Sequence, residues 1–285
     1  MKRFVFFISL MSVSLLVFAK EPVKVNHKEL YSYFSMDFNL PTKTYYNGSS
    51  EAMPAGLERE YNESFYCLGL TYGLLEKLNF DFGFRVWHAN RKVASKEDQM
   101  TKYYIDEPFL RSPIEKTRLL DFEVGFRLIV KEYFFRHSVA ASIFIPTSNK
   151  YDPEPYNIGD GRFFLRFRYL FEKEFNSHLV FGSTGFAFYD ERPENQYLLE
   201  LNYAYKVMEV LYAGIGVGIS LPLSMDDNTN PFETIPQDSG SINIIPRVGY
   251  SPIKNLNLEF RYGYTVAGYN TYLFNMLSFN VSYLY

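Results

Sequence analysis

The stretch Leu78–His88 reads LNFDFGFRVWH and alternates between apolar and polar residues. One face of an extended chain would carry Leu78, Phe80, Phe82, Phe84 and Val86, and the other would carry Asn79, Asp81, Gly83, Arg85 and Trp87. Successive side chains of a β-strand point to opposite faces, so this period of two predicts a strand with one continuous apolar face.

The same alternation returns along most of the chain. It is clear at residues 120–130, 162–171, 197–206 and 256–264, and the first of these is expected to carry an apolar face of Leu120, Phe122, Val124, Phe126, Leu128 and Val130. Weaker matches occur at about residues 28–40, 63–75, 133–146, 178–189, 210–221 and 240–251, and a last strand at about 271–285 brings the count to about twelve. Ten or fourteen strands stay open, because at residues 178–189 Val180, Phe186 and Phe188 compete with Leu179, Phe181 and Tyr189 for the apolar face.

An apolar face that recurs in nearly every strand needs a cover, and the sequence offers no helical segments to provide one. Lipid is the simplest cover, and the composition agrees: the chain is 19% aromatic, with 28 Phe and 25 Tyr against one Trp, as in barrels whose lipid face is ringed by aromatic residues. We therefore predict an all-β fold, a transmembrane antiparallel up-and-down β-barrel of about 12 strands in the cell outer membrane.

The connections between the predicted strands alternate between long and short. The long ones are about 41–62, 92–117, 147–159, 190–195, 222–239 and 267–271, and the short ones lie near Glu76, Glu132, residues 173–176, Glu209 and residues 252–255. Outer-membrane barrels place short turns in the periplasm and longer loops outside, so both termini are expected on the periplasmic side.

The first residues predict export. Lys2 and Arg3 precede an apolar run from Phe4 to Phe18, which is too short to span a membrane and is followed by Ala19, a small residue suited to signal peptidase. We predict a cleaved signal peptide at residues 1–19 and a single barrel domain at residues 20–285. The single cysteine, Cys67, is far from this run and excludes an intramolecular disulfide framework.

Alternation also predicts which charges face the lumen. They are Asp81, Arg85, Asp121, Glu123, Arg127, Arg162, Arg166, Arg168, Glu200, Lys206, Arg247, Glu259 and Arg261, with basic residues in excess. Counting from the turn predicts an ion pair between Arg247 and Glu259. The same counting makes Asp81 a neighbour of Arg127 and Arg85 a neighbour of Glu123, with a register that the long loop between their strands leaves open. Such charges could simply fill a narrow lumen as a structural network, or they could line a water-filled path that favours anionic or polar solutes.

The last strand carries an additional pattern. Alternate positions are occupied by Leu277, Phe279, Val281, Tyr283 and Tyr285, and the sequence ends on this aromatic residue. The pattern resembles the C-terminal assembly signal of bacterial outer-membrane proteins. The resemblance implies that the barrel-assembly machinery is a partner, besides the lipid of the outer membrane.

The sequence does not favour catalysis, a metal or another cofactor. The histidines, His27, His88, His137 and His178, are scattered singly without ligand spacing, and adjacent strand positions would point His137 and Ser138 to opposite faces. A net charge of −3 gives no reason to expect nucleic acid as a partner.

The run from Ile143 to Leu165, IFIPTSNKYDPEPYNIGDGRFFL, is similar to a strand, loop and strand arrangement in outer-membrane transporters grouped with the MetA pathway of phenol degradation. These transporters are related to the fatty-acid-transporter barrels, and the resemblance implies passage of small hydrophobic or aromatic molecules. No N-terminal plug domain is evident, since the first strand begins about ten residues after the predicted cleavage site.

Two functions from different classes follow. The first is an outer-membrane channel or passive transporter for small solutes through a charged, net-basic lumen. The alternative is a structural or surface-interaction barrel with a plugged lumen, which displays the long loops at 41–62 and 92–117.

Overall fold

The computed structural model describes residues 23–46, 52–54, 61–91, 114–130, 134–147, 163–189, 195–223, 240–269 and 271–285. Within these residues, no helix is long and apolar enough to cross a membrane. The strands are β1 (Leu30–Tyr46), β2 (Ala52–Pro54), β3 (Tyr61–Leu75), β4 (Leu78–Arg91), β5 (Ile114–Val130), β6 (Arg136–Pro146), β7 (Phe164–Phe175), β8 (His178–Tyr189), β9 (Gln196–Met208), β10 (Leu211–Pro222), β11 (Gly240–Ile253), β12 (Leu256–Tyr269) and β13 (Thr271–Leu284).

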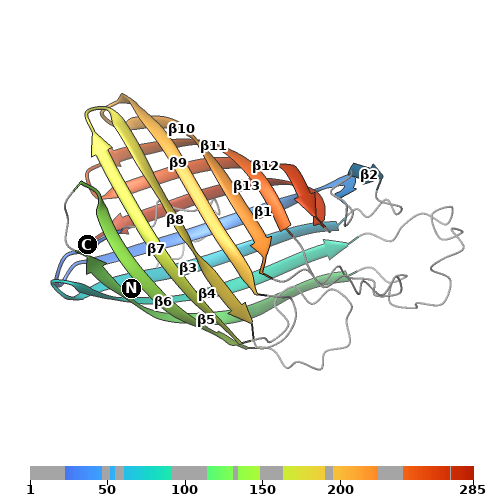
Figure 1. Cartoon of the computed structure of the whole chain (residues 1–285), viewed down its shortest axis with the longest axis horizontal. Coiled ribbons are helices and arrows are strands. Elements are labelled where there is room, and N and C mark those ends of the chain that lie inside the picture. The colour runs from blue at the N-terminus through green and yellow to red at the C-terminus, as the bar shows by residue number, and fades with distance from the viewer. Residues whose placement is uncertain are drawn as a thin grey trace, which may run out of the picture.

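The strands form one closed antiparallel barrel (Figure 1). Each long strand pairs with its neighbours in chain order, and β13 pairs with β1, so that Ser32 opposes Tyr283 and Phe34 opposes Val281. The short strand β2 pairs with the end of β1 alone and is not part of the wall. Twelve strands therefore make the barrel, which confirms the predicted fold class and strand number.

The two ends of the barrel differ. At one end tight turns join β3 to β4, β7 to β8, β9 to β10 and β11 to β12, and there the backbone N–H of Tyr285 donates to the carbonyl of Leu30 over 2.8 Å. We call this the short-turn end, and it lies to the left in Figure 1. The opposite end, where the longer connections attach, is the long-loop end.

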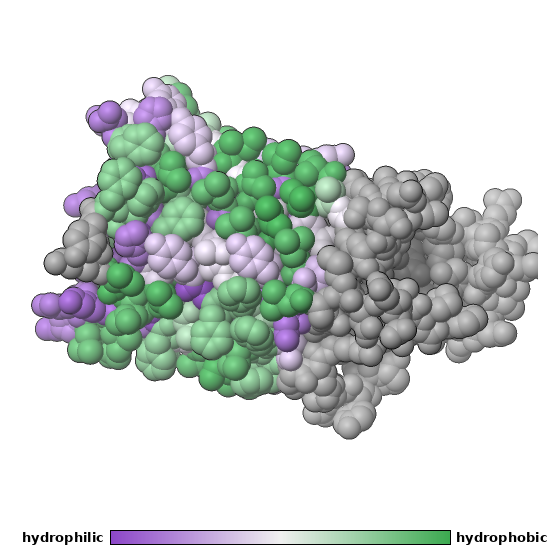
Figure 2. Space-filling view, viewed as in Figure 1, coloured by the Kyte–Doolittle hydropathy of each residue, from purple (hydrophilic) through white to green (hydrophobic). Residues whose placement is uncertain are grey.

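The two faces of the wall have opposite chemistry. In β6 the buried residues are Ser138, Ala140, Ser142 and Phe144, whereas the exposed ones include Val139, Ile143 and Ile145. Figure 2 shows apolar side chains gathered over the outside of the strands and hydrophilic ones at the short-turn end. Because exposed apolar residues recur on strand after strand, the outer surface is suited to lipid and the inner surface is the polar one.

Strand β8 resolves the ambiguity that the sequence left open. Phe181 and Ala187 are buried, whereas Phe186 and Phe188 are exposed.

The last strand, β13, shows the same division of faces. Its residues Ser278, Asn280 and Ser282 are buried, so the alternate aromatic and apolar positions that end at Tyr285 lie on the outer face. Their recognition by an assembly machinery stays a prediction.

The apolar face predicted for β5 is wrong at Leu120. The register between β4 and β5 shifts after Arg85, so that Arg85 opposes Asp121 while Val86 opposes Leu119. Leu120 is consequently only 4% exposed and packs against Trp87, whereas Leu119 is 37% exposed. A β-bulge turns two successive side chains, Leu120 and Asp121, to the inside.

Candidate functional site in the barrel interior

A buried ion pair occupies the interior near the short-turn end. The Arg127 guanidinium, whose side chain is 0% exposed, donates to both carboxylate oxygens of Asp81 over 3.1 Å. Asp81 also accepts a hydrogen bond of 2.7 Å from the Thr71 hydroxyl. The predicted pairing of Asp81 with Arg127 is therefore present, and three neighbouring strands, β3, β4 and β5, contribute to it.

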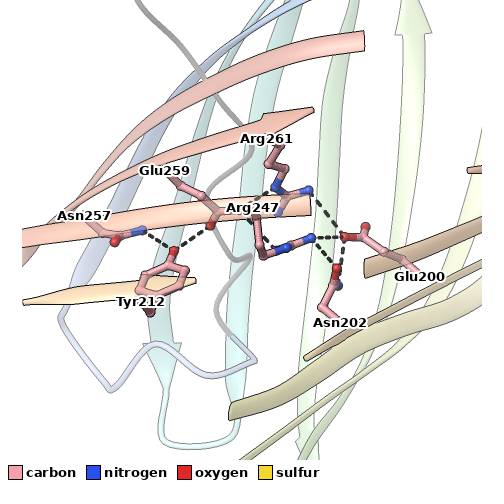
Figure 3. A network of polar contacts seen from close by, with 7 residues as sticks. All are labelled: Glu200, Asn202, Tyr212, Arg247, Asn257, Glu259 and Arg261. Atoms are coloured by element: carbon pink, nitrogen blue, oxygen red, sulfur yellow. Dashed lines mark hydrogen bonds and ion pairs between the residues drawn. The ribbon is translucent and has the colours of Figure 1, made fainter. Parts of the chain in front are cut away.

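A larger network joins β9, β11 and β12 across the middle of the barrel (Figure 3). Arg247 donates to Glu259 over 3.1 Å and to Glu200 over 3.2 Å, and it also bonds Asn202. Arg261 donates to the same two carboxylates, over 2.5 Å to Glu259 and 3.4 Å to Glu200. Two arginines and two glutamates thus form one closed set of ion pairs, which includes the predicted pair of Arg247 and Glu259.

Tyr212 extends this network toward the short-turn end. Its hydroxyl donates to the second carboxylate oxygen of Glu259 over 2.7 Å, and the Asn257 amide donates to that hydroxyl over 3.5 Å. Both oxygens of Glu259 therefore have partners, as a fully buried carboxylate requires.

Glycines on β10 make the network possible. Arg247 and its partners on β9 belong to strands that are not adjacent, because β10 lies between them. Gly216 opposes Asn202, and a Cβ at this glycine would meet the Asn202 Oδ1 at 2.1 Å and the Arg247 Nη2 at 3.3 Å. The bare backbone of β10 therefore leaves the space through which the side chains meet. The sequence analysis does not predict this role. Its trace in the sequence is the alternation of Gly214, Gly216 and Gly218, which leaves one face of the strand without side chains.

A third cluster lies toward the long-loop end. Arg85 pairs with Asp121, through Nε at 2.9 Å and a second guanidinium nitrogen, and Glu123 accepts from Arg166 over 2.8 Å with Arg168 at 3.7 Å. The predicted neighbours Arg85 and Glu123 are thus diagonal to each other across β4 and β5, and the ion-pair partner of Arg85 is Asp121. Arg85 lies directly opposite Asp121, whereas Glu123 lies opposite Gly83 and is reached from β7 across β6.

Aromatic rings pack against this third cluster. Phe144 and Phe164 stack with centroids 4.0 Å apart, and Tyr189 stacks on Phe164 at 4.9 Å. The guanidinium groups of Arg85 and Arg166 lie 5.3 Å and 4.5 Å from the centre of the Phe144 ring. Both arginines are thus held by a carboxylate and by the face of an aromatic ring.

The remaining predicted charges lie elsewhere. Arg162 is outside the described residues, and Lys206 pairs with Glu174 at the short-turn end, where both side chains are largely exposed. We had not identified Asp37 and Glu172 as lumen residues, but both are buried, and Glu172 pairs with Arg136 over 3.4 Å. Among the residues whose side chains the structure describes, the inner-face bases include Arg85, Arg127, Arg136, Arg166, Arg168, Lys206, Arg247 and Arg261, and the acids include Asp37, Asp81, Asp121, Glu123, Glu172, Glu174, Glu200 and Glu259. The basic excess of the whole lumen stays a prediction.

His137 and Ser138, which are adjacent in the sequence, lie on opposite faces of the wall. His137 bonds the Tyr169 hydroxyl over 2.6 Å on the outer face, whereas Ser138 is fully buried on the inner face, so the two do not form a dyad. Among the described residues no three His, Cys, Asp or Glu side chains gather in a way that could hold a metal ion.

Comparison with known proteins gives the class of the fold. No protein-family model and no curated protein sequence matches the chain. An outer membrane channel from Pseudomonas putida F1 superposes with a TM-score of 0.72 at 12% identity, over 94% of this chain and 100% of that one. The translocator domain of autotransporter NalP from Neisseria meningitidis gives 0.49 at 9% identity over 91% and 89%, and the CymD monoaromatic hydrocarbon channel gives 0.46 at 8% over 90% and 88%.

The first likeness identifies the chain as an outer-membrane type of β-barrel, and the solved structure that it resembles is a channel. The expected similarity to barrels of outer-membrane transporters is thereby confirmed for the fold. The other two structures are too distant to add to it.

Proposed function

We propose that this chain forms a passive channel for small polar solutes in a cell outer membrane. The observation that carries the proposal is the partial exposure of interior charges. Arg85 and Glu200 each belong to an ion-paired cluster inside the barrel, yet 36% of each side chain is accessible. Charged groups that are accessible inside a closed wall favour a wet interior over a dry core.

The orientation of the channel is part of the same proposal. The short-turn end would face the periplasm, residues 1–19 would direct export and be removed, and the outer aromatic residues of β13 would be recognised during assembly. Since the outer face is apolar, the wall of the barrel would contact lipid directly.

A preference for anions is the finer part of the proposal. Near the long-loop end, the guanidinium groups of Arg85, Arg166 and Arg168 gather around the carboxylates of Asp121 and Glu123. This local gathering of basic groups supports an interior that attracts anionic or polar solutes. No catalytic step belongs to the proposed function.

Current through single molecules tests the proposal. The purified full-length mature chain, reconstituted in planar bilayers, should show resolvable openings, and vesicles that contain it should swell in small sugars. A variant in which substitutions remove side chains that fill the lumen serves as the positive control. A complete lack of current in both proteins would contradict a channel.

The structural alternative is supported by a specific observation. Arg127 and Arg247 have fully buried side chains with close carboxylate partners, as expected where charges fill a lumen. The long loops 41–62 and 92–117 that would serve such a barrel lie largely outside the described residues. Loss of adhesion on loop deletion, with no current in any variant, would favour this alternative.

A further inference from the structure

The segment that precedes β1 lies inside the short-turn end of the barrel. Val23 and Val25 are only 3% and 1% exposed. Val25 packs with Tyr31 and Tyr33 of β1 and with Leu284 of β13, whereas Val23 packs with Ala140 of β6 and Leu170 of β7. Because β13 and β7 are six places apart in a ring of twelve strands, the segment reaches from one side of the lumen to the other.

A tight turn directs the segment inward. Lys28 has a positive φ of 69°, and its backbone N–H donates to the Gly73 carbonyl over 2.8 Å. The Gly73 N–H donates in return to the backbone carbonyl of Glu29 over 3.0 Å. The Glu29 carboxylate in turn accepts from the Asn26 amide over 2.8 Å. A Cβ at Gly73 would meet the Asn26 carbonyl at 1.7 Å, so only glycine allows the turn to lie this close to β3.

One inner-face side chain clasps the segment. The Asn79 amide donates to the Val25 carbonyl over 3.0 Å and accepts from the Val25 N–H over 2.9 Å, in the orientation of the amide that satisfies both atoms. An adjacent strand would satisfy the backbone of Val25 in the same way. Asn79 is itself fully buried, so both of its hydrogen bonds are shielded from water.

The attachment is slight when it is compared with the wall. Each wall strand is paired along its length on two sides, whereas Val23 and Val25 are held by the packing of two apolar side chains and by the amide of Asn79, and Lys24 between them has a contact of its own. Such a segment can leave its place without opening the barrel. We propose that residues 23–27 form a displaceable bar that closes the short-turn end of the lumen, with Asn79 as its catch and the turn at Lys28 as its fixed end.

This inference rests on the proposed channel function, because a closed path matters only where solutes pass. Three variants of the full-length mature chain test it in planar bilayers: deletion of residues 23–26, Asn79→Leu, and Asn243→Leu as the matched control. Asn243 is an inner-face amide of β11 whose partners are Ser241 and Thr265, away from the bar. Heat-modifiable migration on gels verifies that each variant has a folded barrel.

The wild type should open briefly, and the deletion should conduct for most of the recording. Loss of two hydrogen bonds in Asn79→Leu should raise the ratio of open to closed time by about thirtyfold, with no change in Asn243→Leu. Equal conduction by wild type and deletion would overturn the bar and leave the channel standing. If the deletion raised the open time and Asn79→Leu did not, the role of Asn79 as the catch would be overturned. A lack of current in all variants would overturn the channel itself.

Discussion

Arg247 on β11 donates a hydrogen bond to Asn202 on β9, and the two side chains meet over Gly216 of the strand between them. The contact joins strands that share no backbone pairing. It also ties the buried arginine to Glu200, because the Asn202 amide donates to that carboxylate over 2.9 Å.

Substitution of this glycine should therefore destabilise the barrel. Gly216→Ala places a methyl group where the Asn202 oxygen lies, and loss of the buried hydrogen bonds should lower the free energy of unfolding by about 1–3 kcal/mol. Gly218→Ala is the matched control, since its Cβ would meet the nearest atom at an ordinary 3.4 Å. Urea unfolding in lipid vesicles, followed by the fluorescence of the single tryptophan, Trp87, measures both. Equal stability of the two variants would contradict the role of Gly216.

The pair of Arg127 and Asp81 should be strongly coupled. Arg127→Met leaves a carboxylate buried beside Thr71 and should cost about 3–5 kcal/mol, whereas Lys206→Met, at an exposed pair, should cost about 0–1 kcal/mol. The double variant Arg127→Met with Asp81→Leu should recover much of the loss. The exposed pair that serves for comparison is Lys206 with Glu174. Additive losses in the double-mutant cycle would show that the two side chains do not stabilise each other.

The arginines near the long-loop end should set the ion preference. Replacing both Arg166 and Arg168 with Gln removes two positive charges beside Glu123, so the ratio of anion to cation permeability should fall by about twofold or more. Reversal potentials under a salt gradient measure this ratio, and Arg136→Gln at the short-turn end is the control. An unchanged reversal potential would mean that ions do not pass this cluster.

The outer face should not accept charge. Phe167 on β7 is 45% exposed among other apolar side chains, and Phe167→Arg should cost about 2–4 kcal/mol if this position lies near the middle of the bilayer. Phe167→Leu keeps the face apolar and should change the stability by less than about 1.5 kcal/mol. Refolding into vesicles and urea unfolding compare the two, and equal tolerance of Arg and Leu would place this surface outside lipid.

Local alternation was sufficient to predict the wall of the barrel. Residues 78–88 show why: side chains on a strand alternate without regard to what lies far away, so the faces of Asp81 and Phe82 follow from the sequence alone. The register between strands depends on their connection. The strands of Arg247 and Glu259 are joined by a short turn and the two residues were paired correctly, whereas the long connection between β4 and β5 concealed the register that sets Arg85 opposite Asp121.

Other features depend on tertiary structure and left weaker traces in the sequence. Asp37 lies in a strand that the sequence indicates only weakly, and Glu172 lies just past the predicted end of its strand, so their acidic charges were not counted in the interior. Asn79 was assigned to the polar face of its strand, but its partner is the backbone of Val25, which lies in a segment without periodicity. A backbone partner cannot be identified from residue types, because every residue presents the same peptide group.

The seam between β1 and β13 has a consequence for how the molecule reaches its final state. Tyr31 pairs with Leu284, so the contact joins positions separated by almost the whole chain. Loop closure over such a length makes this pairing intrinsically slow. Until it forms, both terminal strands expose unpaired backbone edges that can template pairing with another chain. The chain in which β1 and β13 have not yet paired would therefore be the species most prone to aggregate. Chaperones that shield strand edges would act on this species before the barrel closes.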